Sequence, residues 1–82
     1  MNEETYKAGC LIAHEIIQYG DFTPEERADE DLYQSAFYEI VTNRQQYAGN
    51  ICEDFTCDED WEGYETGLDE TLGAFCSRQN WK

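Results

Sequence analysis

The fold of this chain is decided by residues 58–78, DEDWEGYETGLDETLGAFCSR. Large apolar side chains recur there at helical spacing, at Trp61, Tyr64, Leu68, Leu72 and Phe75. This period predicts a helix over the whole range. Gly63, Gly67 and Gly73 argue against it, because each glycine costs about 1 kcal/mol relative to alanine inside a helix. The alternative is a shorter helix that is capped by residues 66–69 and starts near Gly67.

An N-terminal helix is expected from about Glu3 to Tyr19. Its first turn carries Glu3 and Glu4, which favour a helix start through the dipole, and Gly20 is a natural C-terminal cap. The apolar residues of this segment fall on one face, made of Tyr6, Cys10, Ala13, Ile16 and Ile17 and widened by Leu11 and Ile12. We expect this face to meet the core.

A second helix starts at the sequence Thr23-Pro24-Glu25-Glu26, which has a capping threonine, a proline at the first helical position and a glutamate three residues after the cap. The period then continues to about Gln46, with an irregularity expected at residues 29–31. Its apolar positions are Ala28, Leu32, Ala36 and Ile40, with Tyr33, Phe37 and Val41 beside them. The helical phase is kept by Tyr47, Ala48, Ile51, Cys52 and Phe55, and Gly49-Asn50 is the point at which a short third helix would split off.

No run of alternating polar and apolar residues predicts a strand. The chain of 82 residues is therefore expected to be a single acidic domain over residues 1–82, with an all-α fold of three to four helices in a small bundle. Its twelve aromatic residues and single proline distinguish it from the highly charged chains that stay disordered.

Charge is the second strong signal. Nineteen acidic residues stand against five basic ones, a formal charge of −14, and no Lys or Arg occurs between Arg44 and Arg78. Such a surface disfavours direct contact with nucleic acid or anionic lipid. The N-terminus has no signal-peptide pattern, and no apolar run approaches the length of a membrane span. We expect a cytoplasmic protein.

The cysteines are expected to be thiols, in keeping with that compartment. Cys10, Cys52 and Cys76 lie among apolar residues at helical spacing and are interpreted as small core residues. Disulfides are the alternative for an exported protein. A zinc site built from Cys10 and His14 with Cys52 and Cys57, and with Cys76 as an extra ligand, is a weaker hypothesis, because zinc ligands usually come in tighter pairs. No cofactor is expected.

The candidate binding residues are carboxylates. If residues 58–78 form one helix, Asp58, Glu62, Glu65 and Asp69 line up on adjacent turns, about 5–6 Å apart. The primary set for partner binding comprises Asp58, Glu59, Asp60, Glu62, Glu65, Asp69 and Glu70. The secondary set comprises Glu25, Glu26, Asp29, Glu30 and Asp31. Exposed members of Trp61, Tyr64 and Trp81 would add anchors, although core packing is the simpler role for Trp61 and Tyr64.

In size, acidity, helical pattern and aromatic content the chain resembles the small phage-encoded DNA-mimic inhibitors of restriction enzymes and CRISPR effectors. The resemblance implies a non-catalytic inhibitor in the host cytoplasm, which blocks the basic groove of a nuclease or another nucleic-acid-binding protein. A groove of that kind recognises its ligand mainly by the charge and spacing of the phosphates. A homodimer would extend the acidic face toward the length of a DNA site.

Three other functions remain as alternatives. One is an adaptor domain that binds a protein through aromatic and apolar residues, with its acids serving only solubility. The second is a divalent-cation module, since residues 58–69 place oxygen side chains at several positions of an EF-hand-like loop, with Gly63 at the sixth. The third, catalysis, has little support, because the chain has a single histidine and lacks a phosphate-binding loop and a nucleophile elbow.

Overall fold

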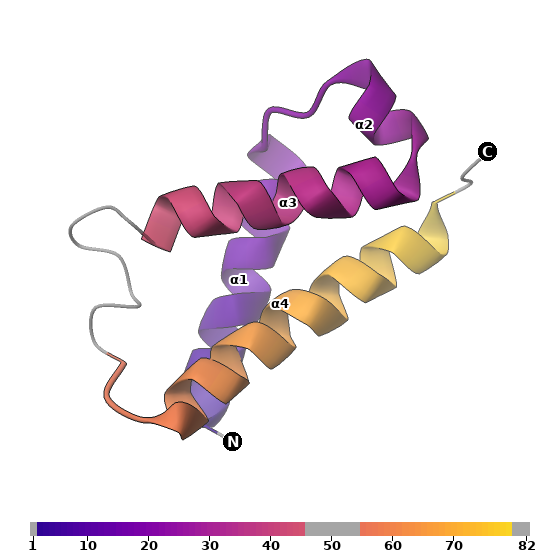
Figure 1. Cartoon of the computed structure of the whole chain (residues 1–82). Coiled ribbons are helices and arrows are strands. Elements are labelled where there is room, and N and C mark those ends of the chain that lie inside the picture. The colour runs from indigo at the N-terminus through magenta and orange to yellow at the C-terminus, as the bar shows by residue number, and fades with distance from the viewer. Residues whose placement is uncertain (1, 46–54, 80–82) are drawn as a thin grey trace.

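The computed structural model describes residues 2–45 and 55–79, which form four helices and contain no strand. The helices are α1 (Glu3–Tyr19), α2 (Pro24–Ala28), α3 (Glu30–Gln45) and α4 (Asp58–Arg78). In Figure 1, α1 crosses behind both α3 and α4, and α2 forms a short turn of helix before α3. The all-α prediction of three to four helices is confirmed. The possible short helix after Gly49-Asn50 lies almost wholly outside the described residues, and Phe55 is not helical.

Local side-chain contacts explain where the first three helices begin. The Asn2 side chain accepts hydrogen bonds from the backbone N–H groups of the first turn of α1. Thr23 and Glu26 form the expected capping box of α2. The irregularity predicted at residues 29–31 is a break at Asp29, whose Oδ1 accepts from the Asp31 and Leu32 N–H groups and so caps α3.

Helix α4 is unbroken from Asp58 to Arg78, so its glycines do not act as helix breakers. Gly63 and Gly67 instead lie on the face that packs against α1. A Cβ at Gly67 would overlap the carbonyl oxygen of Tyr6 and lie 2.9 Å from the Cys10 nitrogen. Gly9 fits in the same way against the backbone at Tyr64. Glycine is needed here because the two helix backbones approach closely.

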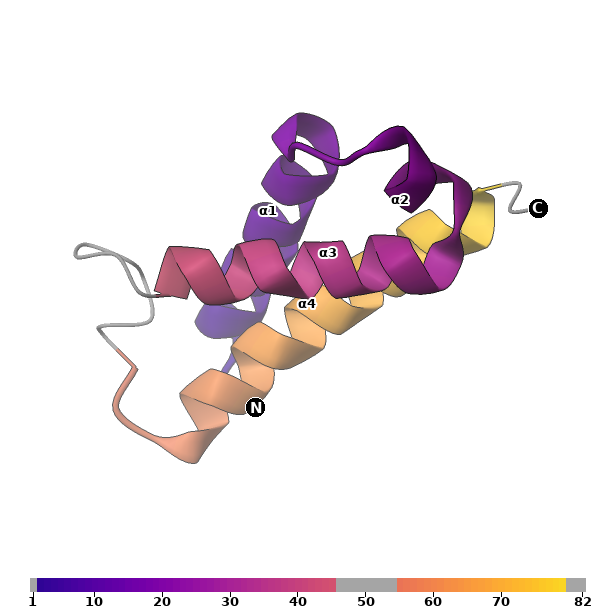
Figure 2. The same ribbon diagram turned by 45° about the horizontal axis from the view of Figure 1, so that its top comes forward.

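The core forms where α1, α3 and α4 meet (Figure 2). Its members are Ala13, Ile16, Phe22, Tyr33, Ala36, Phe37, Val41, Tyr64, Leu68, Leu72 and Cys76. The Tyr33 ring stacks between Phe22, at 4.2 Å, and Phe75, at 5.2 Å between ring centroids. These stacked rings tie the segment before α2 to α3 and to the end of α4.

The buried faces of α1 and α3 are rotated about the helix axes relative to the faces predicted from the sequence. On α1 the small residues Thr5, Gly9 and Ala13 are buried with Ile16, whereas Leu11 is 67% exposed. On α3 the aromatic side of the helix packs inward, and Leu32 is exposed. No helix in residues 2–45 and 55–79 combines the length and the apolar character needed to cross a membrane.

Candidate partner-binding face

The solvent side of α4 carries a group of six exposed carboxylates along one continuous helix. We call it the α4 acidic face, and it consists of the exposed residues Asp58, Glu59, Glu62, Glu65, Asp69 and Glu70. The first and last of these are twelve residues apart, which is about 18 Å along a helix axis. The expectation that Asp58, Glu62, Glu65 and Asp69 share one side of a continuous helix is met by the unbroken α4 and by their exposure.

Asp60 differs from the rest of the primary set, because it is only 9% exposed. Its Oδ1 accepts a hydrogen bond of 2.7 Å from the Asn2 side chain, and its Oδ2 accepts one of 3.0 Å from the Thr56 N–H. These hydrogen bonds, led by that of Thr56, lower the pKa of the Asp60 carboxyl. Asp60 therefore joins the start of α4 to the start of α1, and we exclude it from the α4 acidic face.

Two members of the α4 acidic face also contact tyrosines of neighbouring helices. The Tyr38 hydroxyl of α3 donates to Asp69 Oδ1, and the Tyr6 hydroxyl of α1 donates to Glu70 Oε1 at 3.0 Å. The bond to Glu70 and the charge of that carboxylate raise the pKa of Tyr6. Tyrosines thus hold two carboxylates in place while both remain exposed to solvent.

The secondary acidic set lies apart from the α4 acidic face. Its members belong to α2, to the break before α3 and to the first turn of α3. In Figures 1 and 2 this region and the N-terminal half of α4 are at opposite ends of a molecule whose longest dimension is 40 Å. Glu26 and Asp29 also serve as helix caps. The two predicted sets therefore do not form one continuous surface.

The aromatic residues near the start of α4 have different exposures. Tyr64 is fully buried, so it cannot anchor a partner, whereas Trp61 is 37% exposed. Phe55 packs edge-on against both rings, with centroid distances of 4.9 Å to Trp61 and 5.3 Å to Tyr64. Trp61 is the one anchor candidate in the described chain, and Trp81 lies outside the described residues.

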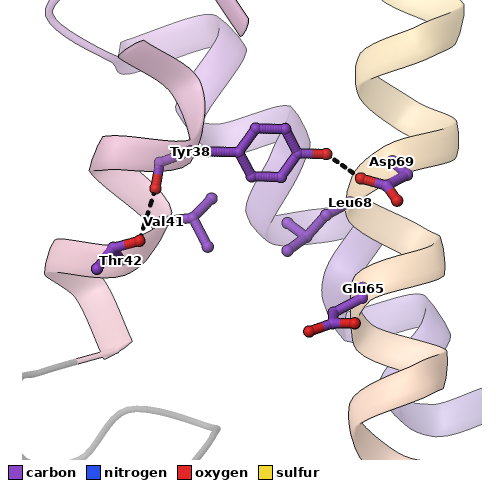
Figure 3. A pocket seen from close by; sticks show the side chains of 6 residues that line it. All are labelled: Tyr38, Val41, Thr42, Glu65, Leu68 and Asp69. Atoms are coloured by element: carbon purple, nitrogen blue, oxygen red, sulfur yellow. Dashed lines mark hydrogen bonds between the residues drawn. The ribbon is translucent and has the colours of Figure 1, made fainter. Parts of the chain in front are cut away.

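A pocket of about 340 Å³ opens between α3 and α4 beside the α4 acidic face. Its lining consists of Tyr38, Val41, Thr42, Glu65, Leu68 and Asp69. Figure 3 shows Val41 and Leu68 between the two helices, with Glu65 and Asp69 on the α4 side and Tyr38 reaching across to Asp69. We call this the α3–α4 pocket. Sequence reasoning missed it, because no sequence pattern places α3 relative to α4.

Both metal hypotheses can be compared with the described residues. The EF-hand-like interpretation of residues 58–69 is wrong, since the whole segment is helical and does not form a loop. Cys10, Cys57 and Cys76 are thiols, and Cys52, one of the proposed zinc ligands, lies outside the described residues. Within the described ranges, no three His, Cys, Asp or Glu side chains are grouped closely enough to hold a metal ion.

Comparison of the chain with protein-family models, curated proteins and solved structures finds no match.

Proposed function

We propose that this chain is a non-catalytic inhibitor that places the α4 acidic face in the basic groove of a nuclease or another nucleic-acid-binding protein. The observation that carries the proposal is the density of carboxylates on a single continuous helix. Six of them over about 18 Å give roughly one charge every 3–4 Å. A nucleic-acid strand carries one phosphate per about 3.4 Å of axis, so a groove lined with Lys and Arg meets a comparable charge density.

The lack of competing cations supports the same proposal. Residues 45–77 contain no Lys or Arg, so the negative field over most of α4 is not cancelled by bases in its own helix. The ion pair between Arg44 and Glu15, at 3.3 Å, joins α3 to α1. A field of one sign steers a cationic partner and raises its rate of encounter.

Charge reversal tests the proposal with a matched control. The test variant carries Asp58→Lys, Glu59→Lys and Glu62→Lys, and the control carries Glu3→Lys, Glu4→Lys and Glu15→Lys. Each triple variant changes two acids in the first turn of a helix and one further along it. Asp60 is left intact because it holds the two helix starts together.

The measurement is DNA binding by purified restriction and RNA-guided nucleases in the presence of each variant. We expect the wild-type chain and the control to block DNA binding by a susceptible nuclease, and the α4 variant to lose at least about tenfold in potency. Equal losses in both variants would show that net charge, and not this face, is responsible.

An adaptor function is the second candidate, and two exposed side chains favour it. Leu11 is 67% exposed and Tyr19 is 75% exposed, both on α1. An adaptor that uses this surface would lose its partner when Leu11 is replaced by Gln. It would keep the partner when the α4 acids are reversed, and DNA or heparin would not displace it.

A further inference from the structure

We propose that the α3–α4 pocket receives an arginine side chain of the protein partner. This inference rests on the proposed function and assigns one specific contact within it. A charged face alone attracts lysine and arginine alike, whereas a pocket that combines apolar walls, an aromatic ring and carboxylates distinguishes between them. The α3–α4 pocket has all three components.

The inner part of the pocket suits the methylene groups of an arginine. Val41 and Leu68, on facing helices, line the cavity and form its apolar floor, with only 4% and 2% of their surface accessible. Figure 3 shows their side chains between the two ribbons. Long basic side chains bury their methylene stems on such surface while the charged end stays near water. The volume of about 340 Å³ lies within the range of small ligand sites.

The carboxylates at the edge suit the charged end. Glu65 and Asp69 are one helical turn apart on α4 and both line the pocket. Glu65 makes no hydrogen bond or ion pair to another described residue. The Tyr38 hydroxyl holds Asp69 through Oδ1, and no described residue donates to Oδ2. Two carboxylates so placed can both accept from the several N–H groups of one guanidinium.

Tyr38 is the feature that favours arginine over lysine. Its ring is partly exposed and lines the pocket, and its hydroxyl contact with Asp69 fixes it across the gap between α3 and α4 (Figure 3). A planar guanidinium stacks on an aromatic face while it donates in its own plane to carboxylates. The compact ammonium group of lysine lacks this plane and is more strongly hydrated.

Two peptides of equal charge test the assignment. One is an oligolysine with a single central arginine, and the other has lysine throughout. Isothermal titration with the full chain at about 150 mM NaCl limits the contribution of distant charges. We expect the arginine peptide to bind about fivefold more tightly and to shift the NMR signals of the pocket residues. Equal affinities for the two peptides would overturn the proposal.

Single neutral substitutions provide the control. Glu65→Gln removes a pocket carboxylate, and Glu59→Gln removes another exposed charge of α4 that lies outside the pocket. Glu65→Gln should abolish the preference for arginine. Glu59→Gln should weaken the binding of both peptides equally and leave that preference unchanged. Loss of the preference in both variants, or in neither, would contradict the assignment.

The two proposals can fail separately. If the chain prefers the arginine peptide but blocks no DNA binding, the arginine-binding role of the pocket stands and the inhibitor function is wrong. If inhibition depends on Asp58, Glu59 and Glu62 but the chain shows no preference for arginine, the inhibitor function stands and the arginine-binding role of the pocket is wrong.

Discussion

At the residue scale, Gly67 shows how one missing side chain positions the two longest helices. A Cβ there would meet the backbone of α1 at Tyr6 and Cys10, and backbone atoms cannot yield without moving the helix. Alanine adds about 1 kcal/mol of helix propensity, but overpacking a close contact costs about 1–3 kcal/mol. We expect Gly67→Ala to lower the free energy of unfolding by up to about 2 kcal/mol, measured by urea denaturation.

Gly73 is the matched control for that substitution, because it lies in the same helix and a Cβ added there would have nothing within 4 Å. Gly73→Ala should raise the free energy of unfolding by about 0.5–1 kcal/mol through helix propensity alone. If both alanine variants were more stable than the wild type, the close approach of α1 and α4 would be wrong.

Asp60 gives stability a specific pH dependence. Hydrogen bonds from Thr56 and Asn2 lower the pKa of its carboxyl in the folded state, so the ionised form is favoured by folding. The stabilisation is therefore present above the ordinary carboxyl range and is lost as the pH falls through the lowered pKa. We expect Asp60→Asn to be less stable than the wild type at neutral pH.

The difference between the two proteins should shrink below about pH 4 and vanish once Asp60 is protonated. Thermal unfolding of both proteins across this pH range isolates the contribution of Asp60, since the other carboxylates titrate in both. A stability gap that stays constant with pH would refute the role of the ionised carboxyl.

At the element scale, local signals in the sequence predict the helices well. The N-terminal helix spans Glu3–Tyr19 as expected, and the capping box starts α2 at Pro24. The expected irregularity is the break at Asp29. Helix α4 follows the apolar period from Trp61 to Phe75, and the alternative of a shorter helix that starts near Gly67 is wrong. These features depend on residues close together in the chain, and such interactions can be read from sequence.

Packing between elements could not be predicted in the same way. Gly63 and Gly67 oppose a helix by propensity, and their benefit comes from contact with α1, far away in the sequence. Leu11 and Leu32 belong to apolar patterns yet are exposed, because small residues on α1 and aromatic residues on α3 fill the core. The α3–α4 pocket and the burial of Asp60 likewise depend on how helices meet.

At the scale of the whole molecule, the charge distribution matters more than any single carboxylate. The chain carries a formal charge of −14 on 82 residues, and its described part is elongated, 40 × 24 × 17 Å. The α4 acidic face lies toward one end of the long axis, and the secondary acidic set lies toward the other (Figures 1 and 2). Under the proposed function, a basic groove that binds α4 would meet the second set only through its long-range field.

In the proposed function, the α4 acidic face competes with nucleic acid through charge. The most direct measurement is the affinity of the chain for a nuclease whose DNA binding it blocks, determined across a range of salt concentrations. We expect the affinity to fall at least about tenfold between about 50 and 500 mM NaCl, because salt screens exposed charges. An affinity that stays constant over this range would contradict the claim.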